Sequence, residues 1–397
     1  MLQSVWFWGL LVAGLLPYWL LPHRLRPGFL ALLSIGFLAS VAPESAAALA
    51  VWSLLFYACG PLLARSRSSW LLWGLVLGVL GYLGYHKYAP GLAAAFAGET
   101  LADRVIVPLG ISYYTFKLVH YAIEVGRGGV PAHSLSDFLS YMFLFPIFGA
   151  GPIERFDHFL AERSNAFDAE HVVEGAYRVI WGFIKKFLLA HVLYVKLFEG
   201  KLTPETLGNN LDAIPSTKVW AYCLAYYAYV YLDFSAYSDI AIGGSRMYGI
   251  RIAENFRFPI VAAHIREYWR RWHISLSQWC QFYVYMPLLG LYRKPLLSLY
   301  ATFLVMGLWH EGSFTRIAWG LYHATGVAVY SWWARYRKKR KWTLPDQRWA
   351  QPFTILLTQL FVTGSMCFLI LWPEKGLSGA LRLLGRLLFL KFGADPA

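Results

Sequence analysis

Three histidine-containing strings, Glu267-Tyr-Trp-Arg-Arg-Trp-His273-Ile-Ser-Leu-Ser277, Gly307-Leu-Trp-His310 and Gly320-Leu-Tyr-His323, lie between Asn255 and His323. The sequence around them is strongly apolar. Ionisable side chains are costly at bilayer depth, and where they occur they usually mark a pathway or a reaction centre. The stretch therefore indicates where the function of this chain lies.

The composition is typical of an integral membrane protein. Of 397 residues, 58% are hydrophobic and 15% are charged, and the mean hydropathy is +0.44, outside the usual range of soluble domains. Apolar runs near the roughly 20 residues that span a bilayer recur along the chain. They cover Val5 to Leu21, Ala47 to Leu63, Trp70 to Tyr85, Trp220 to Ala241, Leu296 to Trp309 and Phe353 to Leu371.

With shorter stretches included, we expect about ten or eleven spans. Lipid offers no partner to backbone polar groups, so the expected fold is all-α, a polytopic transmembrane helical bundle. The first run, Met1 to Leu21, lacks a basic n-region and a cleavage site and is expected to be a true span. Basic residues in the following loops, such as Arg24 and Arg65, predict that the N terminus lies outside the cytoplasm.

A single integral membrane domain is expected over residues 1–397. It comprises N-terminal spans over 1–100, a catalytic core over 101–335, and a C-terminal basic loop and span over 336–397. The one polar interval of any length, Glu154 to Glu174, is expected to be a loop or an interfacial helix. Within it Glu154, like Glu124 upstream, is expected to pair with nearby basic residues.

The net charge of +14 does not indicate nucleic acid binding, because the basic residues are dispersed over short loops. Their one dense run is Arg335 to Lys341. It is interpreted first as a topology signal that faces anionic membrane lipids, and alternatively as a docking patch for an acidic partner or an anionic donor.

No metal site or tightly bound cofactor is predicted. The four cysteines, Cys59, Cys223, Cys280 and Cys367, form no C-x-x-C pair. His310-Glu311 begins like a zinc-protease helix, but no second histidine follows four residues after the first. No glycine-rich phosphate loop is present either.

The segment from His264 to Ser277 combines charged and aromatic residues that cannot all face lipid. We expect it to be a re-entrant or interfacial segment that forms the wall of an internal chamber. His310 follows an apolar run, where a neutral imidazole can act as a general base towards a hydroxyl. Position alone slightly favours the alternative interpretation, a histidine that is hydrogen-bonded within the bundle.

Several motifs resemble the membrane-bound O-acyltransferase family. They are Trp269-Arg-Arg-Trp-His273-Ile-Ser-Leu-Ser277, Gly307-Leu-Trp-His310, Gly320-Leu-Tyr-His323, Pro108-Leu-Gly-Ile-Ser-Tyr-Tyr-Thr-Phe116, Gly151-Pro-Ile-Glu-Arg-Phe156 and Tyr231-Leu-Asp-Phe-Ser-Ala-Tyr-Ser-Asp239. The chain is similar to two bacterial branches, the alginate O-acetyltransferases and the teichoic-acid D-alanyl transfer proteins. Both usually carry Arg-Asp after the Ser-Leu-Ser string, where this chain has Gln281-Phe282.

The resemblance implies a helical bundle around a central tunnel in the bacterial cytoplasmic (inner) membrane. An acyl group, preferably acetyl, would pass from a cytoplasmic thioester donor, acetyl-CoA or an acyl carrier protein, to a hydroxyl. The acceptor would be an extracytoplasmic polysaccharide or a secreted partner transferase. Transfer of D-alanyl to a teichoic-acid-like polymer is the alternative. His310 falls on the family's principal catalytic histidine. His273 falls on its second polar position, usually His or Asn, and would orient a substrate.

Further substrate-binding candidates surround the two histidines. Trp309, Arg270 or Arg271 could stabilise an oxyanion. The remaining candidates are Trp272, His323, Asp233 and Asn255, and the last two could instead hold helices together by hydrogen bonds. Two other classes stay open: a transporter of a polar lipid or polymer, which would use these groups for binding, and a non-catalytic scaffold.

Overall fold

The computed structural model describes residues 4–66, 69–97, 107–342 and 347–390. Over these residues the chain is α-helical, with short 3-10 and π segments and one isolated bridge between Arg163 and Ile250. The predicted all-α class is confirmed. Residues 1–3 of the first expected span and the expected boundary at residue 100 lie outside the described residues.

The chain forms two compact units. Unit 1 comprises Met1–Gly182 and Tyr237–Glu254, and unit 2 comprises Phe183–Ala236 and Asn255–Ala397. The helices of unit 1 are α1 (Val5–Ala13), α2 (Leu15–Leu20), α3 (Arg26–Val41), α4 (Pro43–Ser66), α5 (Ser69–Ala97), α7 (Ile111–Arg127), α8 (Leu135–Phe143) and α9 (Phe156–Ala161). Parts of α10 (Ala169–Ile184) and α13 (Ser216–Met247) also belong to it.

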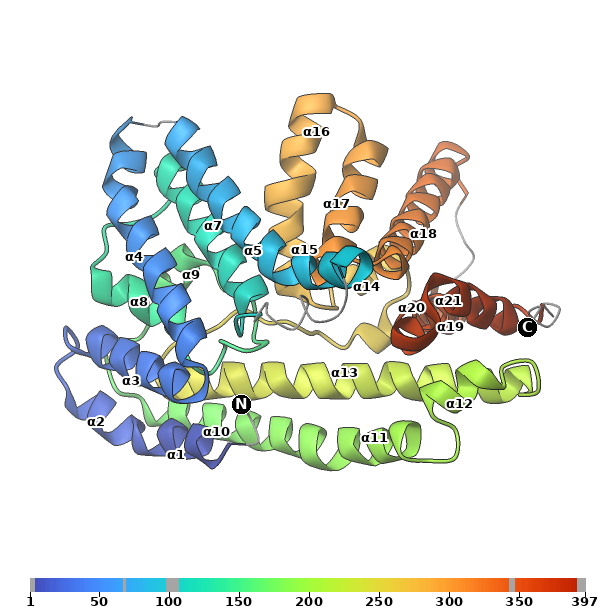
Figure 1. Ribbon diagram of the computed structural model, residues 1–397, viewed down its shortest axis with the longest axis horizontal. Helices are drawn as coiled ribbons and strands as arrows, with labels where there is room; N and C mark the ends of the chain where they lie inside the picture. The colour runs from blue at the N-terminus through green and yellow to red at the C-terminus, as the bar shows by residue number, and fades with distance from the viewer. Residues whose placement is uncertain (1–3, 67–68, 98–106, 343–346, 391–397) are drawn as a thin grey trace. The chain divides into compact units, whose positions relative to one another are not determined.

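Unit 2 contains the histidine strings, and its helices are labelled in Figure 1. Its α-helices are α11 (His191–Phe198), α12 (Pro204–Asn209), α14 (Ile265–Trp269), α15 (Ile274–Cys280), α16 (Met286–Tyr292), α17 (Pro295–His310), α18 (Phe314–Lys339), α19 (Gln347–Ser365), α20 (Cys367–Ile370) and α21 (Trp372–Leu387). Two π segments, Lys185–Ala190 and Gln281–Tyr285, and a 3-10 turn, Pro259–Val261, complete it.

The hydrogen-bond ladder of the first expected span is interrupted. α1 ends at Ala13 and α2 begins at Leu15. Pro17 has no N–H to donate to the carbonyl of Ala13, so one bond of the regular i to i−4 ladder is absent. Gly14 between them has a helical backbone, and the N–H of Tyr18 donates to its carbonyl at 3.1 Å, so Val5–Leu20 continues as one apolar helix with a missing hydrogen bond at Pro17.

Fewer helices than expected are both long and apolar. Among the described residues, Pro43–Arg65 and Trp349–Ile370 are long and apolar enough to span a bilayer. Shorter apolar helices cover Val5–Leu20, Arg26–Val41 and Pro295–His310. α13 and α18 have 32 and 26 residues, but both carry many polar side chains that lower their hydropathy.

The hairpin of α17 and α18 positions His310 (Figure 1). α17 ends at His310, and Ser313 caps α18 by accepting a hydrogen bond from the N–H of Arg316 at 3.3 Å. A Cβ at Gly307 would lie 2.4 Å from the carbonyl oxygen of Arg316, and one at Gly320 would lie 2.4 Å from that of Phe303. Only glycine permits this close approach of the two backbones.

The segment from His264 to Ser277 consists of α14 and α15 joined by a tight turn. His264 caps α14, because its Nδ1 accepts a hydrogen bond from the N–H of Glu267 at 3.0 Å. His273 precedes α15 in the left-handed conformation, with φ 43° and ψ 53°. This break turns the chain between Trp269 and Ile274, so residues of both helices face the same interior space.

Candidate active site

A cavity of about 170 Å³ in unit 2 contains three histidines in its wall. α13, the α14–α15 segment, α17, α18 and the α19–α20 junction all contribute to it. Its lining residues are Val230, Phe234, Tyr268, Trp269, Trp272, His273, His310, Arg316, Trp319, His323, Ser365, Met366 and Leu369. We call it the histidine cavity. It brings together four of the residues that the sequence singles out: His310, His273, His323 and Trp272.

His310 is the exposed member of the three histidines. Its ring packs edge-on against Trp309, with centroids 4.8 Å apart, and against Trp319, with centroids 5.3 Å apart. Such aromatic contacts fix the orientation of a ring. Trp309 also contacts His273, at 6.1 Å between centroids, but does not itself line the cavity.

His273 and His323 are buried, each with 2% of its surface exposed. The ring of His273 stands edge-on to Phe234 at a centroid distance of 4.8 Å. The ring of His323 packs between Trp269, at 5.1 Å, and Trp319, at 4.9 Å. Trp319 therefore touches both His310 and His323.

Three buried ring nitrogens at this cavity have no hydrogen-bond partner among the described residues. They are Nε2 of His273, Nδ1 of His323 and the indole Nε1 of Trp269. Leaving a buried polar atom unpaired costs about 1–3 kcal/mol, and native structures keep few such atoms. Three of them around one small cavity indicate a site that is arranged for a polar ligand rather than for stability.

The lining of the histidine cavity includes no carboxylate. Arg316 is its one permanently charged residue, and its Nε lies 3.4 Å from the carboxylate of Glu311. Arg271 does not reach the cavity, because its guanidinium donates to Glu267 at 2.9 and 2.7 Å. Burial opposes ionisation of Glu267, but the Ala263 N–H and the Arg271 guanidinium hold the pKa of this carboxyl below its usual range.

Asp233 and Asn255 are engaged outside the cavity lining. Asp233 forms an ion pair with Lys186. The side-chain oxygen of Asn255 accepts a hydrogen bond from the hydroxyl of Ser275 at 2.9 Å, and its carbonyl accepts one from Ile274 N–H at 3.0 Å. Asn255 thus holds the start of α15 in place through hydrogen bonds. This agrees with the structural role that was the alternative to substrate binding for this residue.

Arg270 lines a second, larger cavity of about 620 Å³ in unit 2. Trp269 belongs to the walls of both cavities. Sequence reasoning did not select Trp269, Trp319 or Arg316 as site residues. Trp269 and Trp319 each lie one helical turn before a selected histidine, which is the spacing that could have identified them.

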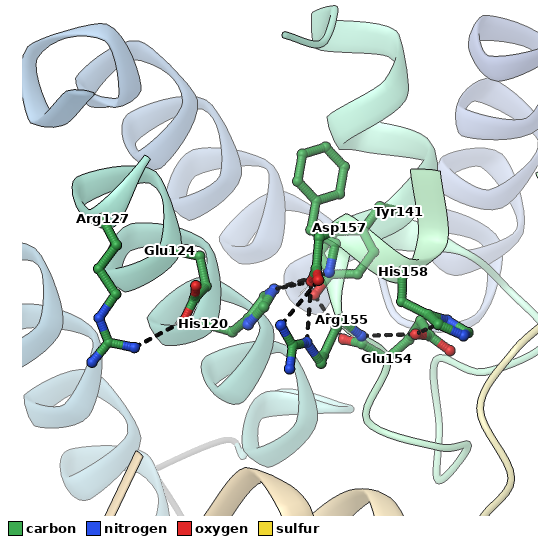
Figure 2. Close-up of polar contacts among 9 residues, drawn as sticks. His120, Glu124, Arg127, Tyr141, Glu154, Arg155, Asp157 and His158 are labelled. Carbon is green, nitrogen blue, oxygen red and sulfur yellow. Dashed lines mark hydrogen bonds and ion pairs between the residues drawn. The ribbon is translucent and has the colours of Figure 1, made fainter. Parts of the chain in front are cut away.

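Unit 1 contains a different buried polar cluster, at the Gly151–Phe156 motif (Figure 2). The carboxylate of Glu154, 1% exposed, accepts hydrogen bonds from the N–H of Arg155 at 2.9 Å, from the N–H of Ala253 at 2.7 Å and from Nδ1 of His158 at 2.8 Å. The expected pairing of Glu154 is confirmed. Glu124 also pairs as expected, with Arg127 at 3.0 Å.

His120 and Asp157 belong to the same cluster (Figure 2). Nε2 of His120 accepts a hydrogen bond from the N–H of Phe156 at 3.0 Å, which identifies the neutral tautomer protonated at Nδ1. Asp157 receives two hydrogen bonds from the guanidinium of Arg155, at 3.1 and 2.9 Å. This cluster ties α7 and α9 together.

The histidine cavity has the parts that acyl transfer to a hydroxyl needs. His310 offers an accessible imidazole at the end of α17, and two further imidazoles and an indole N–H are available to orient polar groups. Within the described residues, no group of three His, Cys, Asp or Glu side chains is placed to hold a metal ion.

Comparisons with known proteins match this region. The family model of the membrane-bound O-acyltransferases matches residues 105–372. The chain is 37% identical over 285 residues to a probable alginate O-acetylase of Pseudomonas aeruginosa, which covers 67% of this chain and 52% of that protein. It is 31% identical over 275 residues to a teichoic acid D-alanyltransferase of Bacillus subtilis, covering 64% of this chain and 66% of that protein.

A peptidoglycan O-acetyltransferase of Helicobacter pylori is 28% identical over 354 residues, which cover 79% of this chain and 64% of that protein. The chain spans about half the length of the alginate relatives that it matches. The range matched by the family model includes every residue that lines the two cavities of unit 2. Because the match also covers more than half of the sequence, the chain belongs to the membrane-bound O-acyltransferase family.

Proposed function

We propose that this protein transfers a short acyl group, preferably acetyl, from a thioester donor to a hydroxyl group of a cell-envelope polysaccharide. It would act as a multi-pass protein of the bacterial cytoplasmic membrane, with no tightly bound cofactor. The observation that carries the proposal is the histidine cavity with its three unpartnered ring nitrogens. The family membership supports the reaction class, and the named relatives support envelope polymers as acceptors.

His310 acts as the general base in this proposal. Its neutral imidazole takes the proton from the acceptor hydroxyl as the hydroxyl oxygen attacks the thioester carbonyl carbon. The carbon–sulfur bond of the tetrahedral intermediate then breaks. The proton passes from the imidazolium to the leaving thiolate, so that the products are an ester and a free thiol. The exposure of His310 in the cavity wall suits a group that must meet both substrates.

The buried nitrogens orient the reacting groups. The indole N–H of Trp269 can only donate, so it suits the carbonyl oxygen that becomes negative in the transition state. An imidazole nitrogen of His273 or His323 can donate to or accept from a hydroxyl. Of the oxyanion donors expected from the sequence, Trp309 does not line the cavity and Arg271 is engaged with Glu267, which favours Trp269 for this role.

The size and charge of the cavity favour acetyl over D-alanyl. A volume of about 170 Å³ corresponds to roughly five or six water molecules, enough for a short acyl group and its attacking hydroxyl. A D-alanyl group carries an ammonium, which needs an acidic partner when it is buried. The cavity lining offers no carboxylate and includes Arg316 instead. D-alanyl transfer remains the second candidate because of the teichoic acid relatives.

Mass spectrometry of envelope esters tests the proposal. Wild type, His310→Ala and a control variant, His191→Ala, are expressed at matched membrane levels in a strain that lacks the native gene. His191 is an exposed histidine of the same unit that lines neither cavity. We expect ester-linked acetyl groups on an envelope or secreted polymer to disappear in His310→Ala only. The mass of the lost group separates acetyl from D-alanyl, and an ester profile unaffected by His310→Ala would favour a transporter or a scaffold.

A further inference from the structure

Among the residues that line the histidine cavity, Arg316 alone carries a permanent charge. It lies three residues after the cap Ser313, in the first turn of α18. A cation at this end of a helix is unfavourable, because the helix dipole is positive there. Stabilisation of α18 therefore does not account for an arginine at this position.

The ion pair of Arg316 with Glu311 leaves most of the guanidinium unused. The Nε of Arg316 lies 3.4 Å from Oε2 of Glu311, whereas charged hydrogen bonds are usually about 2.7–2.9 Å long. The two terminal nitrogens of Arg316 donate no hydrogen bond among the described residues. The pair of Arg382 with Asp212 in the same unit is shorter, at 2.7 Å. Arg316 thus has donors available for a further anion.

Arg316 lies close to the three histidines along α18. Arg316, Trp319 and His323 follow one another on the same face of this helix, and all three line the histidine cavity. The ring of Trp319 contacts that of His310, with centroids 5.3 Å apart. Arg316 is about 5 Å further along the helix axis than Trp319, a separation similar to the width of one sugar ring. A hydroxyl at His310 and an anionic group at Arg316 can therefore belong to the same sugar residue.

Under the proposed function, the two ends of α18 face different compartments. The helix has 26 residues, about 39 Å at roughly 1.5 Å per residue, which exceeds the roughly 30 Å hydrocarbon core of a bilayer. Its basic end, within the run from Arg335 to Lys341, is expected to face the cytoplasm. Arg316 lies at the opposite end, where an envelope polysaccharide is present and a cytoplasmic thioester is not. The ligand that suits Arg316 is therefore the acceptor.

We propose that Arg316 binds an anionic group of the acceptor and thereby selects acidic saccharides over neutral ones. The group is a carboxylate or a phosphate on the sugar whose hydroxyl is acylated, since a guanidinium matches the oxygen geometry of both. Glu311 holds the guanidinium before the acceptor binds and is displaced by the acceptor anion. The unpartnered nitrogens of His273 and His323 bind other hydroxyls of the same sugar. This inference rests on the proposed function and specifies its acceptor.

The two partners of the ion pair should give opposite results when each is neutralised. Arg316→Gln removes the donor to the acceptor anion, so ester formation should fall by about tenfold or more. Glu311→Gln removes the competitor for the guanidinium, so ester formation should be at least as high as in the wild type. Arg316→Lys keeps the charge but not the forked geometry, and it should retain part of the activity. A pair that only held the α17–α18 turn together would make Arg316→Gln and Glu311→Gln fall alike, which would overturn the inference.

Analysis of the esterified polymers tests the charge of the acceptor. Each variant is expressed at matched membrane levels in a strain that lacks the native gene, and the polymers are separated by anion exchange. The control is Arg382→Gln, which breaks a similarly exposed ion pair of the same unit that lines neither cavity. We expect the wild type and the control to carry esters on the acidic fraction, and Arg316→Gln to lose them. Esters confined to a neutral polymer, or an unchanged ester level in Arg316→Gln, would overturn the inference.

Mass spectrometry of the acylated sugars identifies the source of the negative charge. A uronic acid mass assigns the ligand of Arg316 to a carboxylate, and a sugar phosphate mass assigns it to a phosphate. Both results support recognition of an acidic acceptor. An acylated sugar that carries neither group would contradict it.

A binding measurement separates recognition of the acceptor from stabilisation of the transition state. The polymer that carries the ester is de-esterified with mild base and cut into oligosaccharides. These are titrated against the purified full-length protein in lipid nanodiscs without any thioester, and saturation-transfer NMR follows the binding. Arg316→Gln is expected to raise Kd by about tenfold or more. An equal Kd in wild type and Arg316→Gln would show that Arg316 does not contact the acceptor anion.

Failure of this inference is distinct from failure of the proposed function. If the wild type forms esters that survive in Arg316→Gln, only the assignment of Arg316 fails. If His310→Ala keeps ester formation, the catalytic role of His310 fails, whatever the result for Arg316→Gln. If the wild type forms no ester, the proposed function fails, and the inference fails with it.

Discussion

The polar cluster of unit 1 and the histidine cavity of unit 2 both bury histidines, but they treat the ring nitrogens differently. In unit 1, Nε2 of His120 accepts from a backbone N–H and Nδ1 of His158 contacts Glu154. In unit 2, Nε2 of His273 and Nδ1 of His323 have no partner among the described residues. A satisfied nitrogen stabilises the fold, whereas an unsatisfied one costs free energy that a bound polar group can recover.

Under the proposed function, this difference separates structural histidines from those that meet a substrate. His120 and His323 are equally enclosed, with 1% and 2% of their surface exposed. Both lie near strings that resemble family motifs. They differ in that Nε2 of His120 accepts a hydrogen bond, whereas Nδ1 of His323 has no partner among the described residues, and we propose a substrate contact for His323 alone. The following substitutions test that assignment.

The largest expected effect is that of His310→Gln. Loss of the general base should lower ester formation by about 10²- to 10⁴-fold. The melting temperature of the purified protein should change little, because His310 is exposed. Initial rates of acyl transfer and a thermal melt of the same preparation give both readouts. If His310→Gln retained its turnover, the histidine cavity would no longer differ from the unit 1 cluster in having a catalytic histidine.

Glu154→Leu is expected to lower the stability of the fold, in contrast to His310→Gln, which should lower activity. It leaves the N–H groups of Arg155 and Ala253 and the ring of His158 without their acceptor, so unfolding should become easier by about 3 kcal/mol or more. Denaturant titration in detergent measures this change. Glu174→Gln is the control, since its pair with Arg246 is half exposed and should contribute less than about 1 kcal/mol. Equal effects of the two variants would contradict the assignment.

His323→Phe and His120→Phe form a matched pair. The first removes an unpartnered nitrogen, so stability should stay constant or rise by about 1 kcal/mol while acyl transfer falls. The second leaves the N–H of Phe156 without an acceptor and should cost about 1–3 kcal/mol. Melting temperatures and transfer rates of both variants are compared with those of the wild type. A stability loss in His323→Phe as large as that in His120→Phe would assign His323 to the fold.

The smallest expected effect concerns pH. The hydrogen bond to the Glu154 carboxylate raises the pKa of His158, against an opposing contribution from burial. The protonated form is thus bound more strongly in the folded state, and its contribution is complete below the unfolded pKa of about 6.5. It is lost as the pH rises through the raised folded pKa. The free energy of unfolding, obtained from melting curves at about pH 5.5 and above, should decline by less than about 1 kcal/mol. This decline should be absent in His158→Gln.

The sequence predicted the helical class, and it singled out three histidines that line one cavity, but it did not predict their surroundings. His273, His310 and His323 stand out in the sequence because ionisable side chains are costly within apolar segments. Trp269 and Trp319 do not, because aromatic residues make up 18% of the chain. The pairing of Arg271 with Glu267 follows the i, i+4 rule and could have been expected. The unpartnered nitrogens could not, since they depend on how helices distant in sequence pack.

The helix count shows the same limit. Hydropathy predicts one span over Val5 to Leu21, and the structure has one apolar helix over Val5–Leu20, but hydropathy does not show the hydrogen bond that is missing at Pro17. Conversely, α13 and α18 are long helices whose polar residues obscure their length from a hydropathy measure. Ser235 and Ser238 of α13 are buried, so polarity along this helix reports contacts inside the protein rather than exposure to water.

The left-handed backbone at His273 limits which amino acids can occupy this position without strain. Asn, Asp and His enter this conformation more readily than other side chains with a Cβ, and β-branched residues are strongly disfavoured. The alternation of His and Asn that the family resemblance implies at this position is therefore permitted by the main chain before any chemistry is considered. A valine or threonine at residue 273 would shift the start of α15. If such a variant lost activity, the loss could come from the altered backbone and would not report on the imidazole. Asparagine is the informative replacement.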